Sequence, residues 1–181
     1  GRLLFALGVL WGSISRVMVV GGAMDIELQK LSYDDLAFEA DRARRYEAHL
    51  SILMVDIDGL GLINERLGKD AGDYVLGEVA NVLRSNTRKI DCFGSWEGKD
   101  FILVSVDHNV FGSIAMAEKL KRVIARHKFE WEGRPCKVTC SIGVARGMPQ
   151  NDTQISQLVA TAKYAVARAI SAGGNRVEYV G

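Results

Sequence analysis

The chain has 181 residues, of which 48% are hydrophobic and 25% are charged, with 2 prolines and 19 glycines. This length suits one domain of ordinary size plus one extra element, and it is enough to bury a core. The 23 Lys and Arg residues nearly balance the 22 Asp and Glu residues, so the formal net charge is +1. The balance excludes a global basic field that would hold a nucleic acid duplex, and it excludes the acidic excess typical of disorder. Any anion-binding site must therefore be local.

Residues 3–20 (LLFALGVLWGSISRVMVV) are the most apolar stretch and predict a helix, with residues 1–22 as a separate N-terminal element. Its apolar positions follow a 3-4-3 spacing at Leu3, Leu7, Leu10, Ile14 and Val17. Arg16 leaves the uncharged part short of the ~20 residues of a membrane span, and no secretory signal pattern is present. Three interpretations stay open: packing on this or an upstream domain, a dimerising or signal-transmitting helix, and a membrane-proximal segment.

The globular domain is predicted over residues 31–181, with elements that alternate between the two periodicities. Helices are expected over 34–47, 62–67, from Asp73 onward, 113–127 and 155–171, and strands over 51–58, 90–96, 101–106, 137–145 and 176–180. Gly98 is expected to supply a positive φ at the tip of a hairpin. The order predicts an α/β fold with a mixed central sheet covered by helices.

Three cysteines, Cys92, Cys136 and Cys140, have no disulfide or zinc-ligand spacing. Cys136 and Cys140 would lie roughly 13 Å apart along one strand, which is too far for a disulfide. We therefore expect reduced thiols in a cytoplasmic protein.

Two carboxylates, Asp56 and Asp58, follow the apolar strand that is predicted to lie at the centre of the sheet. Residues two apart on a strand project to the same side, and such a pair at the end of a sheet can hold Mg²⁺ against phosphates. An Asp after an apolar strand also commonly begins a turn. The pair alone leaves both interpretations open.

A longer series of motifs runs through the chain: Asp56-Ile57-Asp58, Ile63-Asn64, Gly72-Asp73, Glu97-Gly98-Lys99-Asp100-Phe101, Ser141-Ile142-Gly143-Val144-Ala145 and Gly173-Gly174-Asn175-Arg176-Val177. The series resembles the GGDEF family, the bacterial diguanylate cyclase domains that make cyclic di-GMP from two GTP molecules. The resemblance covers residues 34–180. It implies a fold like the palm of nucleotidyl cyclases and polymerases, which agrees with the predicted order of elements.

The resemblance implies roles for several residues. Asp56 matches the family's metal-binding aspartate, and the carbonyl of Ile57 would also face the metal. Asn64 and Asp73 match side chains that contact guanine. The alternatives for these two residues are an Asn inside a helix and an Asp at a helix N-cap.

The signature that names the family is altered here. Glu97 stands at the position of the first glycine, Lys99 at that of an acidic metal ligand, and Asp100 at that of the following glutamate. A carboxylate at the phosphate turn meets phosphate with like charge. A lysine beside a divalent metal is still more unfavourable for metal binding, because even two unit charges of like sign ~4 Å apart repel by ~4 kcal/mol at an effective dielectric near 20.

Phosphate contacts are also missing. Gly61 occupies a position where the family usually has lysine, and Ile170 and Gly174 fall where it usually has Lys and Arg. Metal and phosphate ligands are therefore lost together, while the guanine-contacting residues remain. This combination argues against cyclase chemistry, which depends on metal-assisted attack and charge neutralisation.

A second pattern, Arg88-Lys89-Ile90-Asp91, is an RxxD sequence separated from Glu97 by five residues. In the family this spacing marks the inhibitory site, a surface site that binds cyclic di-GMP. Arginine can fork onto phosphate and stack on guanine, and aspartate can accept hydrogen bonds from guanine. Lys119 matches the position of a further basic ligand. The alternative is ordinary surface charge at a helix-to-strand corner.

These observations predict a catalytically inactive GGDEF domain that acts as a cyclic di-GMP receptor through Arg88, Asp91 and Lys119, with the ligand bound as a stacked pair. A vestigial nucleotide site would contain Asp56, Asp58, Asn64, Asp73 and Asp100. We expect no catalytic residue, no required cofactor and no bound Mg²⁺ or other metal.

The expected partners are cyclic di-GMP and either a second copy or another protein, without nucleic acid. Membrane association would come only through an upstream segment. Two alternatives stay open: a weakly active cyclase in which Asp100 serves as a metal ligand, and a dimerisation or protein-docking module that binds no nucleotide.

Overall fold

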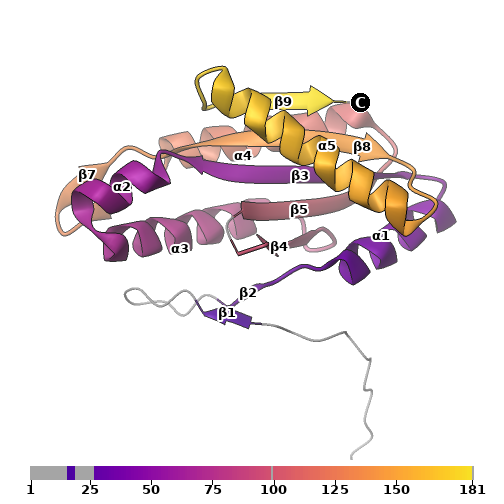
Figure 1. Cartoon of the computed structure of the whole chain (residues 1–181), viewed down its shortest axis with the longest axis horizontal. Helices are drawn as coiled ribbons and strands as arrows, with labels where there is room; N and C mark the ends of the chain where they lie inside the picture. Colours follow the sequence, from indigo (N-terminus) through magenta and orange to yellow (C-terminus); the bar gives the residue numbers. More distant parts are fainter. Residues whose placement is uncertain (1–15, 19–26, 99, 181) are drawn as a thin grey trace, which may run out of the picture.

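The computed structural model of the chain describes residues 16–18, 27–98 and 100–180 (Figure 1). A five-stranded sheet has the order β4-β5-β3-β8-β9. Its strands are β3 (His49–Asp58), β4 (Cys92–Trp96), β5 (Asp100–Asp107), β8 (Thr139–Gly147) and β9 (Val177–Val180). Neighbouring strands are antiparallel except β8 and β9, which are parallel. The predicted α/β fold with a mixed central sheet is confirmed.

Helices cover both faces of this sheet (Figure 1). The helices are α1 (Tyr33–Arg45), α2 (Leu60–Leu67), α3 (Lys69–Asn86), α4 (Val110–Arg126) and α5 (Asp152–Ser171). Because strand side chains alternate, Ile52 and Met54 of β3 join the core under α1 and α5, whereas Leu53 and Val55 join the core under α3 and α4. All four are at most 1% exposed. β3 is therefore the central strand that its apolar sequence predicts.

The corner between α2 and α3 differs from the sequence prediction. Asp73 is not the N-cap of the longer helix, because α3 already begins at Lys69. Gly68 ends α2 and precedes α3, with a φ of 91° that side chains other than glycine rarely adopt. One residue therefore serves as the cap of both helices, and Asp73 lies within α3.

Short elements were also missed or shifted. A hairpin of β6 (Phe129–Trp131) and β7 (Arg134–Cys136) precedes β8. Strands of three residues are too short to show a periodicity. The strand predicted from residue 90 begins at Cys92, because the backbone N–H of Asp91 bonds to the carbonyl of Arg88 and forms a turn there.

The N-terminal helix predicted over residues 3–20 does not extend over Arg16–Met18. These residues form strand β1, which pairs antiparallel with β2 (Glu27–Gln29). The sequence Val-Met-Val-Val at 17–20 is rich in β-branched residues, which favour extended backbone. The rest of the predicted helix lies outside the described residues. The packed domain begins before residue 31, where it was predicted to start, because Leu28 is already buried in the core.

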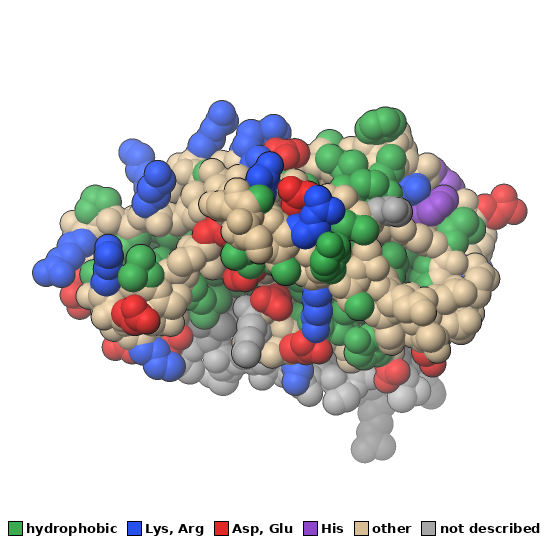
Figure 2. Space-filling view, turned by 45° about the horizontal axis from the view of Figure 1, so that its top comes forward, with side chains coloured by type: hydrophobic (Ala, Val, Ile, Leu, Met, Phe, Trp, Pro, Cys, Tyr) green, Lys and Arg blue, Asp and Glu red, His purple; other side chains and the backbone are tan. Residues whose placement is uncertain are grey.

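The surface carries charges of both signs. Figure 2 shows Lys and Arg side chains interspersed with Asp and Glu side chains over the visible face, in agreement with the formal net charge of +1. In the described ranges, no helix is both long and apolar enough to cross a bilayer.

Candidate functional site

The carboxyl end of β3 brings three predicted carboxylates together. Asp56 pairs with Ser141 of β8, and the neighbouring pair Val55–Phe101 places Asp56 beside the start of β5, where Asp100 lies. Burial raises the pKa of Asp56, and the nearby carboxylates of Asp100 and Asp58 raise it further. The carboxylates of Asp56 and Asp100 therefore repel each other at this end of the sheet.

Asp58 has a different environment from Asp56. Its carboxylate accepts hydrogen bonds from Thr139 Oγ1 at 2.7 Å, from Ser141 Oγ at 2.7 Å and from the backbone N–H of Asn175 at 2.8 Å. These bonds join β3 to β8 and to the turn that leads into β9. A Cβ added at Gly174, whose φ is 72°, would lie 3.0 Å from Asp58 Oδ1. The side chain of Asp58 thus connects three segments of the fold.

Asn64 and Asp73 lie at the corner between α2 and α3. The amide of Asn64 packs against Gly72, which leaves no room for a side chain there, and Asp73 is the next residue. Asp73 Oδ2 lies 3.0 Å from Lys69 Nζ, one helical turn earlier. The structure therefore brings the two predicted guanine contacts into one region, with Asp73 paired to a lysine.

The hairpin between β4 and β5 carries the altered signature. Glu97 and Gly98 have φ values of 49° and 74°, which confirms the expected positive φ at Gly98. The carboxylate of Glu97 lies 2.6 Å from Lys163 Nζ on α5. Lys99 lies outside the described residues. Of the three positions predicted to have lost a cation, Gly61 has open space around it and Ile170 is exposed.

The nearby carboxylates of Asp56 and Asp100 are the candidate ligands for a divalent metal at the end of β3. Within 27–98 and 100–180, no group of three or more His, Cys, Asp or Glu side chains is arranged to hold a metal ion. Asp56 and Asp100 are the nearby acidic pair, whereas both oxygens of Asp58 already accept hydrogen bonds from protein groups. Mg²⁺ usually takes six oxygen ligands in octahedral geometry. Waters and substrate phosphates commonly supply most of these ligands beside one or two carboxylates, so Asp56 and Asp100 would provide the protein's share of such a site.

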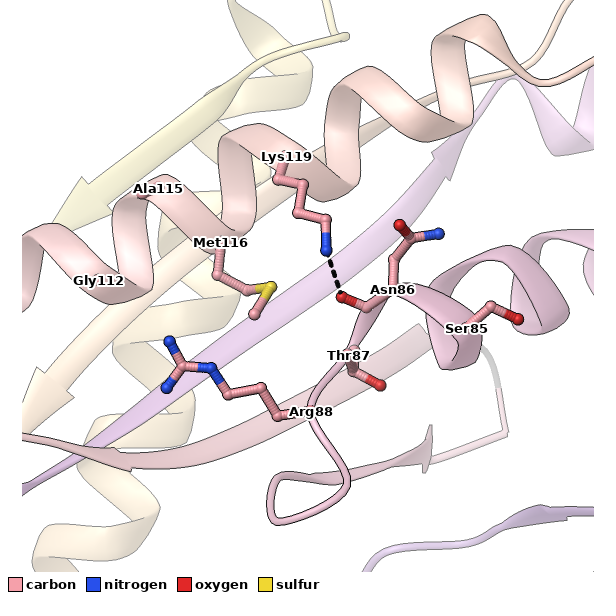
Figure 3. Close-up of a pocket in the computed structure, with 8 residues that line it drawn as sticks. All are labelled: Ser85, Asn86, Thr87, Arg88, Gly112, Ala115, Met116 and Lys119. Atoms are coloured by element: carbon pink, nitrogen blue, oxygen red, sulfur yellow. Dashed lines mark hydrogen bonds between the residues drawn. The ribbon is translucent and has the colours of Figure 1, made fainter.

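The RxxD sequence occupies the turn between α3 and β4. On one side of this turn, a cavity of about 460 Å³ separates it from α4 and is lined by Arg88, Lys119, Met116 and Thr87, among others. Figure 3 shows Arg88 reaching below Met116 while Lys119 approaches from the same helix as Met116. Lys119 Nζ donates to the carbonyl of Asn86 at 3.0 Å. Arg88 and Lys119 thus line one pocket.

A second cavity of about 790 Å³ lies on the other side of Arg88 and contains Asp91. Burial raises the pKa of Asp91, although the Arg88 guanidinium lowers it. Arg88, Ser85 and Thr87 line both cavities, and the second cavity carries the carboxylates of Asp91 and Glu39 among several basic side chains.

Sequence reasoning missed the contribution of α1 to this second cavity. Arg42 and Glu39 of α1 line it, and the Arg42 guanidinium donates to the carbonyl of Ile90 inside the RxxD turn. The contact spans 48 residues of sequence, so no local pattern could have revealed it.

Comparison with solved structures identifies the fold. The diguanylate cyclase SiaD from Pseudomonas aeruginosa, solved with its activator SiaC, has a TM-score of 0.78 at 24% identity over 85% of this chain and 59% of that chain. The coiled coil and GGDEF domain of DgcB from Caulobacter crescentus, solved with cyclic di-GMP, has a TM-score of 0.76 at 19% identity, covering 85% of this chain and 82% of that chain. Both likenesses establish the fold alone.

The sequence establishes the family. The profile described as "Diguanylate cyclase, GGDEF domain" matches residues 29–176, and the chain therefore belongs to the GGDEF family. A curated relative, diguanylate cyclase A of Treponema denticola, is 38% identical over 96 residues, which cover 53% of this chain. The match covers only 26% of that relative. Members of this family occur in proteins of cyclic di-GMP signalling.

Proposed function

We propose that this GGDEF domain is a receptor for cyclic di-GMP that does not synthesise it. The observation that carries the proposal is that Arg88 and Lys119, from two different elements, line the same pocket (Figure 3). Asp91 follows Arg88 in the same turn and lines the adjoining cavity.

The chemistry of these residues suits a cyclic dinucleotide. Two cations on one pocket match a phosphodiester anion, and a guanidinium can bind phosphate with two parallel hydrogen bonds. Asp91 is an acceptor for the N–H groups of a guanine edge. Cavities of about 460 and 790 Å³ flank Arg88, which provides room for more than one base and supports a stacked pair as the bound form.

Several features support the absence of cyclase activity. Glu97 places a carboxylate at the signature turn, and Lys163 of α5 holds it by an ion pair. Lys99 stands in the sequence where the family has an acidic ligand, and Gly61, Ile170 and Gly174 carry no charge for phosphate. Asp58 is engaged by three protein donors. Metal and phosphate binding are thereby weakened together.

The structural relatives agree with two kinds of partner. DgcB was solved with cyclic di-GMP, and SiaD was solved with a protein activator. For this chain we propose cyclic di-GMP as the primary ligand, with a second copy or another protein as the partner that reads its binding.

A weakly active cyclase is the second candidate. It is favoured by the proximity of Asp56 and Asp100, whose charges interact, and by the names of the curated relatives. In this case Asp100 would be recruited as an acidic ligand.

Two calorimetric titrations of the purified protein separate these candidates. Binding of cyclic di-GMP with no turnover of GTP in the presence of Mg²⁺ supports the receptor. Conversion of GTP supports the cyclase. No binding at ~100 μM cyclic di-GMP, about −5.5 kcal/mol, overturns the receptor proposal and favours a docking module.

A further inference from the structure

Glu39 is the one charged side chain in the described part of the chain that is buried, at 2% exposure. It lies on α1, accepts a hydrogen bond from the thiol of Cys92 at 3.3 Å and lies 2.9 Å from the guanidinium of Arg42. Burial raises the pKa of Glu39 against the opposing effects of the thiol and the guanidinium. A buried charge is costly unless it is paired with an opposite charge. The position of its partner, Arg42, therefore indicates the role of Glu39.

Arg42 reaches from α1 to the RxxD turn. Its Nη1 and Nη2 atoms donate to the carbonyl oxygen of Ile90 at 3.4 and 3.3 Å. Ile90 stands between Arg88 and Asp91, and its own side chain is 65% exposed. Packing of the Ile90 side chain therefore does little to hold this turn, and the contact from Arg42 adds to the bond between the Asp91 N–H and the Arg88 carbonyl.

We infer that Glu39 is a positioning residue for the RxxD turn. An arginine side chain has many conformations in water, and the fixed carboxylate of Glu39, 2.9 Å from Nη2, favours the one in which the guanidinium lies beside it and faces Ile90. Glu39 thus directs Arg42, Arg42 holds the carbonyl of Ile90, and the turn presents Arg88 and Asp91 to their two cavities. The consequence for ligand binding rests on the proposed function, whereas the order of the turn is a property of the ligand-free protein.

The first experiment therefore uses no ligand. Amide hydrogen exchange is compared between the parent, Glu39→Gln and Asp41→Asn, a control that removes a charge from the same helix where its ion-pair partner is Arg44. Gln keeps the size of the side chain and an oxygen for the Cys92 thiol. We expect exchange over residues 87–92 to accelerate at least about fivefold relative to the rest of the core, and in Glu39→Gln only. Unchanged exchange in this segment, or acceleration spread evenly over the core, would overturn the inference.

The second experiment asks whether Glu39 acts through Arg42. Cyclic di-GMP affinity is measured for Glu39→Gln, Arg42→Lys and the double variant. We expect each single variant to bind roughly tenfold more weakly, and the double variant to lie within about twofold of Arg42→Lys, because the two residues form one chain of contacts. Effects that multiply would contradict the inference. If the parent binds no cyclic di-GMP, the proposed function fails, and the exchange experiment still decides the role of Glu39.

Discussion

Glu97 and Lys163 form an ion pair of 2.6 Å although 66 residues separate them in the sequence. The pair connects the tip of the β4–β5 hairpin to α5. Glu97 also has a φ of 49°, in the left-handed region that costs a side chain roughly 1–2 kcal/mol. Glu97, at the first position of the family's signature, thus has a strained backbone and a side chain paired with Lys163.

Replacement of Glu97 tests this arrangement. Both partners are partly exposed, so the pair contributes only ~0.2–1 kcal/mol. Glu97→Gly loses the pair but relieves the backbone, and we expect a free energy of unfolding equal to or slightly above that of the parent. Glu97→Ala loses the pair and keeps the strain, so it should unfold about 1 kcal/mol more easily than Glu97→Gly. Urea unfolding measures both, and an alanine variant more stable than the glycine variant would contradict the conformational argument.

We expect purified protein to make no measurable cyclic di-GMP from GTP and Mg²⁺. Lys99→Asp should not restore synthesis, because the charges missing at Gly61, Ile170 and Gly174 would still be absent. Product analysis by chromatography checks both proteins. Product from the parent would favour the weakly active cyclase, and loss of that product in Asp100→Asn would then identify Asp100 as the recruited ligand.

Removal of the Asp56 charge should stabilise the fold. Because burial and two nearby carboxylates raise the pKa of Asp56 above its ordinary 3.8, its ionisation disfavours the folded state. Stability should therefore decline as the pH rises through the interval between the ordinary pKa and the raised one. Asp56→Asn should exceed the parent in melting temperature at neutral pH, with a gain that shrinks as the pH falls toward 4.

Glu65→Gln, a change at an exposed carboxylate of α2, is the control for Asp56→Asn. It should show no comparable gain at any pH. A destabilised Asp56→Asn would show that the charge of Asp56 is compensated in the folded protein, contrary to this prediction.

Asp58 should respond in the opposite direction, although it lies two residues from Asp56 on the same strand. Asp58→Ala leaves Thr139, Ser141 and the N–H of Asn175 without their acceptor. We expect a loss of about 2–4 kcal/mol in the free energy of unfolding, because three hydrogen bonds to a charged acceptor, two of them part-buried, are lost together. Denaturant unfolding beside Asp56→Ala provides the comparison. A loss below about 1 kcal/mol would mean that water replaces these bonds.

The contrast between Asp56 and Asp58 shows where sequence reasoning reaches its limit. Their spacing placed them correctly at the end of β3, because strand periodicity is a local property. The donors that distinguish them come from β8 and from the turn before β9, more than 80 residues away for the side-chain bonds. Such pairings depend on the tertiary fold and leave no local pattern.

The same distinction holds for the fold and the RxxD region. Long elements such as β3 and α5 were predicted well, because a run of apolar residues or an apolar stripe at helical spacing is visible in the local sequence. The β6–β7 hairpin was too short to show a period, and Gly68 replaced the cap expected at Asp73. Glu39 was missed because its role depends on Arg42 reaching a backbone carbonyl, a group that every residue has.

The last prediction concerns the anchor of the ligand. A guanidinium bound to phosphate forms charge-assisted hydrogen bonds worth ~1.5–3 kcal/mol, so Arg88→Ala should weaken cyclic di-GMP binding by roughly tenfold to a hundredfold. Asp91→Ala should weaken it and also reduce discrimination between guanine and adenine dinucleotides. Lys121→Ala on α4, which removes a lysine paired with Glu118, is the matched control and should bind normally, as should Asp56→Ala. Calorimetry measures all four, and an Arg88→Ala protein that binds as tightly as the parent would exclude this turn as the receptor site.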